Sequence, residues 1–141
     1  MSQNSSVVAD EWGEYDDFIE LSNTSNEDIS LAGYFVSDSA DEPFEAKLPE
    51  GVVVPAKGFL LLWADHDPQQ GGEHVDFALS AAGDGVWLTS PDGTLLDAVQ
   101  FGASTEDWSY ARYSEIGPDG SVWDWCAIPT PGAENGDACG D

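Results

Sequence analysis

The residues best suited to chemistry lie in one loop, where two histidines stand among three acidic residues. Asp65, His66 and Asp67 are consecutive, and Glu73 and His74 follow a stretch rich in Pro, Gln and Gly. Imidazole nitrogens with carboxylate oxygens suit Zn²⁺ or another transition metal, whereas carboxylates with carbonyl oxygens suit Ca²⁺. The spacing matches no established metal motif, so a solvated acidic loop is the alternative. We predict no cofactor, with Ca²⁺ left open as the one candidate.

The sequence lacks the arrangements that catalysis usually requires. The two histidines are far along the chain from the two thiols, Cys126 and Cys139, and no serine lies in a Gly-x-Ser-x-Gly motif. No glycine-rich loop precedes a helical pattern, so a phosphate cradle is not expected. The sequence therefore predicts that the protein is not an enzyme.

The two cysteines lie near the C-terminal end of the chain. Their spacing fits neither a zinc motif nor a redox Cys-x-x-Cys. In an oxidising compartment they could pair, and we predict a Cys126–Cys139 disulfide that fastens the tail to the last strand. By chain-entropy reasoning, a closed loop of this size contributes about 3 kcal/mol.

Aromatic side chains are the second candidate for binding. Trp123 and Trp125 flank Asp124, so on a strand both lie on one face. Two interpretations remain open, because aromatic rings fill the core of a small sandwich and also form exposed recognition patches. Trp63 lies within an apolar run, and we expect it in the core.

The charge balance of the chain is extreme. Lys and Arg number 3 and Asp and Glu number 28, which gives a net charge of −25. Such a surface repels phosphate groups, so the sequence predicts no binding to nucleic acid or to anionic membranes. No apolar run is long enough to span a bilayer, which predicts no membrane insertion. Residues 1–4 lack signal-peptide features, so we expect a secretion signal only in a longer parent chain.

Short segments punctuated by turn residues must position these side chains. Strand-type patterns occur at residues 18–21, 31–36, 44–48, 52–54, 59–64, 77–80, 86–89, 95–101 and 122–126. The first two should pair as a hairpin across a polar turn. Residues 59–64 are apolar on both faces and should form a central strand. Together the segments predict one all-β domain, a sandwich or barrel without long helices.

Motifs spread along most of the chain resemble those of the lamin-tail domain, an immunoglobulin-like β-sandwich. They are Ile19-Glu20-Leu21, Leu31-x-Gly33-Tyr34, Pro55-Ala56-x-Gly58, Leu79-Ser80-x-x-Gly83, Asp92-Gly93, Ser109-x-x-Arg112 and Thr130-Pro131-Gly132. The resemblance implies a sandwich over residues 14–135, with an N-terminal arm at 1–13 and a C-terminal tail at 136–141. Glu20 and Arg112 both belong to the family pattern, and we expect them to form a structural ion pair.

The chain departs from the family pattern at its beginning. The strand that usually comes first is absent, shortened or supplied by residues 7–9. An unpaired sheet edge could join the same edge of a second copy. Because two copies of charge −25 repel each other, we expect mostly monomer, with an edge-strand dimer as the alternative.

The resemblance also implies a role. Bacterial lamin-tail-like domains look like non-catalytic interaction or scaffold modules of longer secreted or cell-surface proteins. The expected partners are protein or polysaccharide at the cell surface. A calcium-dependent adhesion or carbohydrate-binding module is the alternative. The DNA-binding role known for nuclear lamins does not carry over, because the basic surface it needs is missing.

Overall fold

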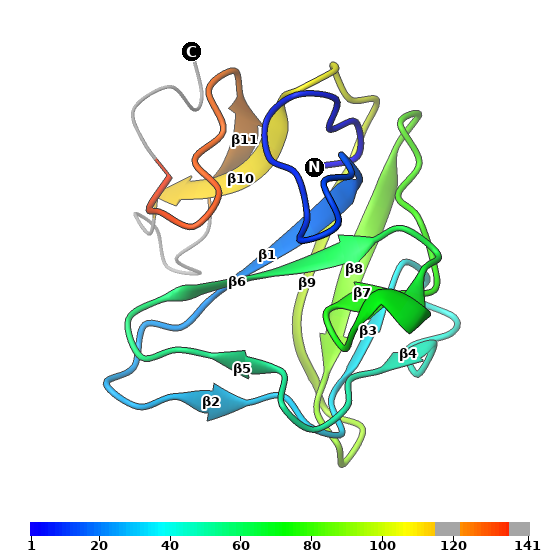
Figure 1. Cartoon of the computed structure of the whole chain (residues 1–141), viewed down its shortest axis with the longest axis vertical. Coiled ribbons are helices and arrows are strands. Elements are labelled where there is room, and N and C mark those ends of the chain that lie inside the picture. Colours follow the sequence, from blue (N-terminus) through cyan, green and yellow to red (C-terminus); the bar gives the residue numbers. More distant parts are fainter. Residues whose placement is uncertain (115–121, 136–141) are drawn as a thin grey trace.

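The computed structural model describes residues 1–114 and 122–135, which form an almost entirely β-structured domain (Figure 1). The strands are β1 (Asp17–Ser22), β2 (Ile29–Ser30), β3 (Phe35–Ser37), β4 (Ala46–Lys47), β5 (Val53–Val54), β6 (Phe59–Ala64), β7 (His74–Val75), β8 (Asp84–Thr89), β9 (Leu95–Phe101), β10 (Ser109–Ser114) and β11 (Val122–Cys126). Within the described residues, the one helical element is a 3-10 turn, η1 (Pro68–Gln70). The predicted all-β class is confirmed.

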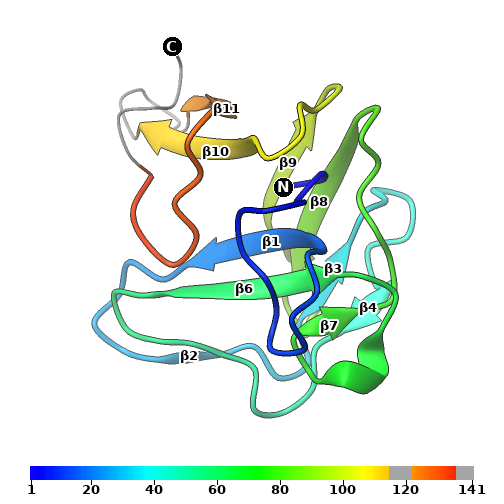
Figure 2. The same cartoon turned by 45° about the horizontal axis from the view of Figure 1, so that its top comes forward.

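The strands form two larger sheets and two small ribbons. One sheet has the order β1-β6-β7, the other has the order β4-β3-β8-β9, and the ribbons are β2-β5 and β10-β11. Figures 1 and 2 both show the β10–β11 ribbon at the opposite end of the molecule from β2 and β5. The sheets are open, as expected for a sandwich and not for a barrel.

Strand β6 is the central strand of its sheet, as its apolar sequence predicted. It pairs antiparallel with β1 over its whole length and parallel with β7 at its end. Phe18 of β1 lies opposite Trp63 of β6, with ring centroids 5.9 Å apart and an edge-on geometry. Trp63 is 5% exposed, which confirms its place in the core.

The predicted hairpin between residues 18–21 and 31–36 is wrong. Strand β1 pairs with β6, and residues 31–36 are not one strand. The backbone N–H of Leu31 donates to Val52, and Gly33 has φ +82°, a conformation that interrupts an extended strand. The chain therefore turns at Gly33 and continues in the other sheet, where β3 pairs with β4 and β8.

Apolar side chains from both larger sheets and the β2-β5 ribbon form one core. Its buried members are Ile19, Leu31, Val36, Leu48, Val52, Val54, Leu62, Ala64, Val75, Phe77 and Leu79. Phe77 and Leu79 follow the period-2 pattern expected for residues 77–80, although that segment is not hydrogen-bonded as a strand. The alternation of buried and exposed side chains is thus present in residues 77–80 even though they form no hydrogen-bonded strand.

The N-terminal arm, residues 1–16, forms loops that pack against the sheet. Residues 7–9 do not form a strand. The carbonyl of Met1 accepts the backbone N–H of Phe18 at 3.0 Å, and the amide of Asn4 donates to Val8 and Asp16. Figure 2 shows the arm crossing in front of β1 and β6. The arm thereby covers part of the β1 edge that the missing first strand was expected to leave open.

Candidate functional site

Asp65 and His74 meet at the buried end of the β1-β6-β7 sheet. Asp65 directly follows β6, and His74 begins β7, which runs parallel to β6 with Ala64 opposite Val75. The His74 Nδ1 atom lies 2.5 Å from Asp65 Oδ2, and the two side chains are 0% and 1% exposed. The strand pairing thus brings together two of the residues that the sequence proposed as metal ligands.

His74 is held between two carboxylates. Its second ring nitrogen, Nε2, lies 2.6 Å from Oε1 of Glu11, which belongs to the N-terminal arm. Burial by itself would lower the pKa of His74, but the hydrogen bonds and charges of Asp65 and Glu11 outweigh it and raise the pKa above its ordinary value. With a carboxylate at each nitrogen, the doubly protonated ring that donates in both directions is the favoured form.

The N-terminal arm supplies further carboxylates. Asp10 starts a tight loop in which its Oδ1 accepts the backbone N–H groups of Trp12 and Glu14 at 2.8 and 2.9 Å. Gly13 has φ +82° and allows the chain to turn there. Asp10 is 8% exposed. The loop therefore fixes a buried carboxylate close to the sheet.

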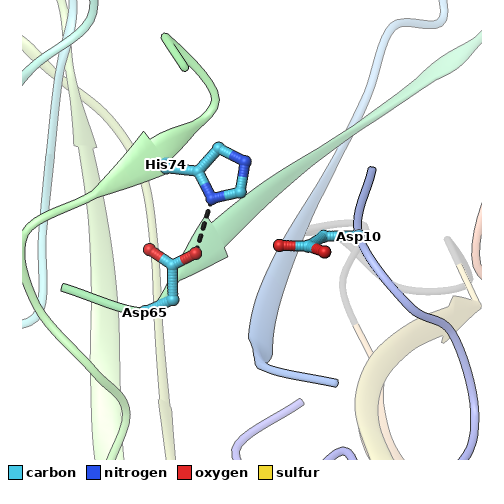
Figure 3. Close-up of side chains that lie close together, drawn as sticks. All are labelled: Asp10, Asp65 and His74. Carbon is cyan, nitrogen blue, oxygen red and sulfur yellow. Dashed lines mark hydrogen bonds and ion pairs between the residues drawn. The ribbon is translucent and has the colours of Figure 1, made fainter. Parts of the chain in front are cut away.

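Two groups of potential ligand atoms share Asp10. Asp10, Asp65 and His74 form the first group and Asp10, Glu14 and Asp16 the second, and within each group the ligand atoms lie within 4.8 Å of one another. Figure 3 shows the Asp10 carboxylate pointing toward Asp65 and His74. Carboxylate oxygens at this density can hold a divalent cation.

The other residues proposed as metal ligands lie elsewhere. His66 contacts Asp76 at 3.3 Å, with side chains 63% and 73% exposed. The Asp67 carboxylate accepts a hydrogen bond from Gln69 in the exposed η1 turn. His66, Asp67 and Glu73 belong to neither of the two groups of potential ligand atoms. Of the predicted set, the structure therefore brings only Asp65 and His74 into a group of potential ligand atoms, together with Asp10 of the arm.

Sequence reasoning did not single out Asp10 and Glu14. Their spacing, with Gly13 in between, is compatible with an acidic loop that presents several carboxylates. The loop lies about fifty residues before Asp65, however, and nothing local indicates that the two segments meet.

The second candidate site is a cavity of about 900 Å³ lined by β1, β9, the β10–β11 ribbon and the segment after β11, and we call it the groove. Tyr110 and Trp123 stack with centroids 6.0 Å apart, and Trp125 lies 5.1 Å from Tyr110 and 6.2 Å from Phe101. Trp123 and Trp125 are both partly buried and both line the groove. As predicted, both lie on one face of β11. Their side chains are neither fully buried nor fully exposed.

Arg112 does not form the predicted ion pair with Glu20. Its Nη2 atom donates to both carboxylate oxygens of Asp97 at 3.0 and 2.9 Å, and its guanidinium lies 4.7 Å from the Trp123 ring centroid. The Glu20 carboxylate instead accepts the backbone N–H of Gly132 at 2.6 Å. Glu20 is thus engaged by the Thr130-Pro131-Gly132 turn, and Asp97 on β9 takes its place beside Arg112.

Cys126 ends β11 and is 1% exposed. Cys139 lies outside the described residues, as do all residues of the predicted C-terminal tail. The Cys126–Cys139 disulfide stays a prediction.

A separate acidic contact joins Asp38, just after β3, to Glu45. The backbone N–H of Asp38 donates to Glu45 Oε2 at 3.3 Å. Burial, followed by a hydrogen bond between the Asp38 and Glu45 side chains and by the charge of Glu45, raises the pKa of Asp38 to about 6. This contact makes a testable contribution to the pH dependence of stability.

Replacing Asp38 with asparagine should stabilise the protein more at about pH 8 than at about pH 5. A carboxyl group whose pKa is raised by folding binds its proton more tightly in the folded state. Its favourable contribution is therefore complete at low pH and is lost as the pH rises from 3.8 toward about 6. Because Asp38 is partly exposed, solvent screening should keep the effect below about 1 kcal/mol. Urea unfolding at both pH values measures it.

Asp41→Asn is the matched control, because it removes the same charge from an exposed side chain nearby. Its effect on stability should be similar at the two pH values. An equal pH dependence in both variants would contradict the role of the Asp38–Glu45 contact.

Comparison with known proteins gives one match. A family model described as Lamin Tail Domain matches residues 2–103, which include the arm and all strands from β1 to β9. Searches of curated proteins and of solved structures found no match. Among the described residues, no helix is long and apolar enough to cross a membrane.

Proposed function

Because the chain belongs to the lamin tail domain family, with its immunoglobulin-like fold, we propose that it is an interaction module of a longer secreted or cell-surface bacterial protein. Domains of this family are generally non-catalytic. The acidic surface, with a net charge of −25, supports an extracellular setting because it keeps the module soluble and monomeric. The predicted disulfide points to the same oxidising compartment.

The groove is the observation that supports binding most directly. It is lined mostly by aromatic and aliphatic side chains, the main component of ligand sites, together with a substantial polar and charged part. Tyr110, Trp123 and Trp125 provide rigid aromatic surface, and aromatic residues dominate the energetics of protein interfaces. Glu20 and Asp97 place carboxylates in the same lining, which also contains the cationic side chains of Arg112 and Lys57.

The neighbouring strand edge indicates the kind of partner. In the described part of the chain, β9 is the outer strand of its sheet and pairs with β8 alone. Residues of β9 line the groove, so an extended segment could add to this edge while its side chains meet the aromatic rings. Given the charge of the module, we propose an extended protein segment that carries Lys or Arg.

A synthetic peptide of alternating Val and Lys tests this function by calorimetric titration. It should bind, and a Val/Glu peptide of equal length should not. Trp123→Ala should weaken binding at least about tenfold, since truncated aromatic anchors typically cost more than 1 kcal/mol. Trp12→Ala is the matched control, because Trp12 is 61% exposed and lies outside the groove lining.

The alternative is a carbohydrate ligand, favoured by the stacked Tyr110 and Trp123 rings, which resemble the aromatic platforms that sugars use. A linear β-glucan oligosaccharide is the probe for it in the same titration. Binding of the oligosaccharide without binding of the cationic peptide would reject the protein partner. An unchanged affinity of Trp123→Ala for the peptide would reject the groove as its site.

A further inference from the structure

Two buried carboxylate oxygens beside Asp65 have no partner. Asp10 Oδ1 accepts two backbone N–H groups, whereas Asp10 Oδ2 is buried and accepts no hydrogen bond from the described residues. Asp16 Oδ2 is in the same state. Asp10 is only 8% exposed. Buried charged oxygens without a donor are rare in folded proteins because they lose hydration and gain nothing in return, so these atoms indicate a missing ligand.

The surrounding geometry fits a cation. The ligand atoms of Asp10 lie within 4.8 Å of those of Asp65 on one side and of Glu14 and Asp16 on the other. Oxygens at opposite sides of a Ca²⁺ ion are separated by twice the coordination distance of about 2.3–2.6 Å. Each group of three is therefore compact enough to surround one ion, and Asp10, which belongs to both groups, connects them.

The excess of negative charge around these carboxylates also favours a bound cation. The carboxylates of Asp10, Glu14, Asp16 and Asp65 gather at this end of the sheet. His74 is the one cationic partner at this end of the sheet, since no ion pair among the described residues joins Lys or Arg to these acids. Arg112 is bound to Asp97, and Lys57 donates to the carbonyl of Thr24. Asp10, Glu14, Asp16 and Asp65 thus form a cluster of four carboxylates, and His74 provides the one positive charge beside it.

We propose that Asp10, Glu14, Asp16 and Asp65 bind one Ca²⁺ ion and that His74 positions Asp65. Both nitrogens of His74 already face carboxylates, at 2.5 and 2.6 Å, so His74 serves as a hydrogen-bond donor and the ligand atoms are oxygens. All-oxygen sites favour Ca²⁺ over Zn²⁺, and water completes the coordination shell. This site lies outside the groove and fastens the arm to the end of β6.

Calorimetric titration of CaCl₂ into the EDTA-treated and desalted protein tests the site. We expect one Ca²⁺ per chain with a dissociation constant of roughly 0.1–1 mM, the range of extracellular modules. Asp10→Asn and Asp16→Asn should each weaken binding at least about tenfold, because each removes a ligand charge. Asp41→Asn removes an exposed carboxylate and should change the affinity less than about twofold.

The variants are chosen to preserve the loop. Asparagine keeps the Oδ1 acceptor that receives the N–H groups of Trp12 and Glu14. Wild-type protein that takes up no Ca²⁺ by about 10 mM overturns the proposal, whatever the variants do. Equal affinity of wild type, Asp10→Asn and Asp16→Asn would also overturn it. ZnCl₂ serves as the second probe, and binding of Zn²⁺ without Ca²⁺, lost in His74→Ala, would overturn the oxygen-ligand assignment.

Discussion

Replacing His74 with alanine should lower the free energy of unfolding by about 3–5 kcal/mol. The imidazole is fully buried between Asp65 and Glu11, and the Asp65 side chain is only 1% exposed. Without its cationic partner, Asp65 becomes an uncompensated buried charge, and the arm loses its contact to β7. Urea unfolding near neutral pH in buffer containing EDTA measures the loss.

The second histidine provides a matched control. His66 also contacts one carboxylate, that of Asp76, but both side chains are more than half exposed. Exposed pairs of this kind contribute little, so His66→Ala should change stability by less than about 0.5 kcal/mol. Similar losses for the two variants would show that the buried arrangement around His74 is not important for the fold.

Replacing Phe77 with alanine should cost about 3–5 kcal/mol. Phe77 is 2% exposed and belongs to the core shared by the two larger sheets. Truncation removes most of its apolar surface and leaves a cavity that neighbouring β-structure cannot fill, because the strands around it are fixed by their hydrogen bonds. Thermal or urea unfolding would report the loss.

Phe44→Ala is the corresponding control. Phe44 is 56% exposed and packs edge-on against Phe35 with centroids 5.0 Å apart. Loss of this pair should cost at most about 1.5 kcal/mol. If Phe44→Ala were as destabilising as Phe77→Ala, the core described here would be misplaced.

The strands with the clearest sequence patterns were predicted from the sequence, and their partners were not. Residues 59–64 formed the central strand because an apolar run of that length can be buried on both faces. The predicted partner of β1 was wrong because strand order depends on contacts between residues that are far apart in the sequence. A polar turn between two strand patterns favours a hairpin, but Gly33 diverted the chain into the other sheet.

The residues of the candidate cation site show the same difference between what local sequence predicts and what depends on long-range contacts. Asp65 and His74 were identified because His and Asp in one loop are chemically distinctive. Asp10 and Glu14 were missed because acidic residues are abundant in this chain, with 28 Asp and Glu, and only the folded arm selects these two. The partner of Arg112 was mispredicted for the same reason, because one arginine had many possible acidic partners and no local pattern distinguished Asp97.

A structure determined from crystals grown in the presence of CaCl₂ tests most directly whether the arm and the end of β6 form one cation site. We predict a single ion coordinated by oxygens of Asp10, Glu14, Asp16 and Asp65 at about 2.3–2.6 Å, with His74 still hydrogen-bonded to Asp65. A structure in which Asp10 Oδ2 and Asp16 Oδ2 contact only water, or in which Ca²⁺ binds elsewhere on the acidic surface, would contradict the assignment.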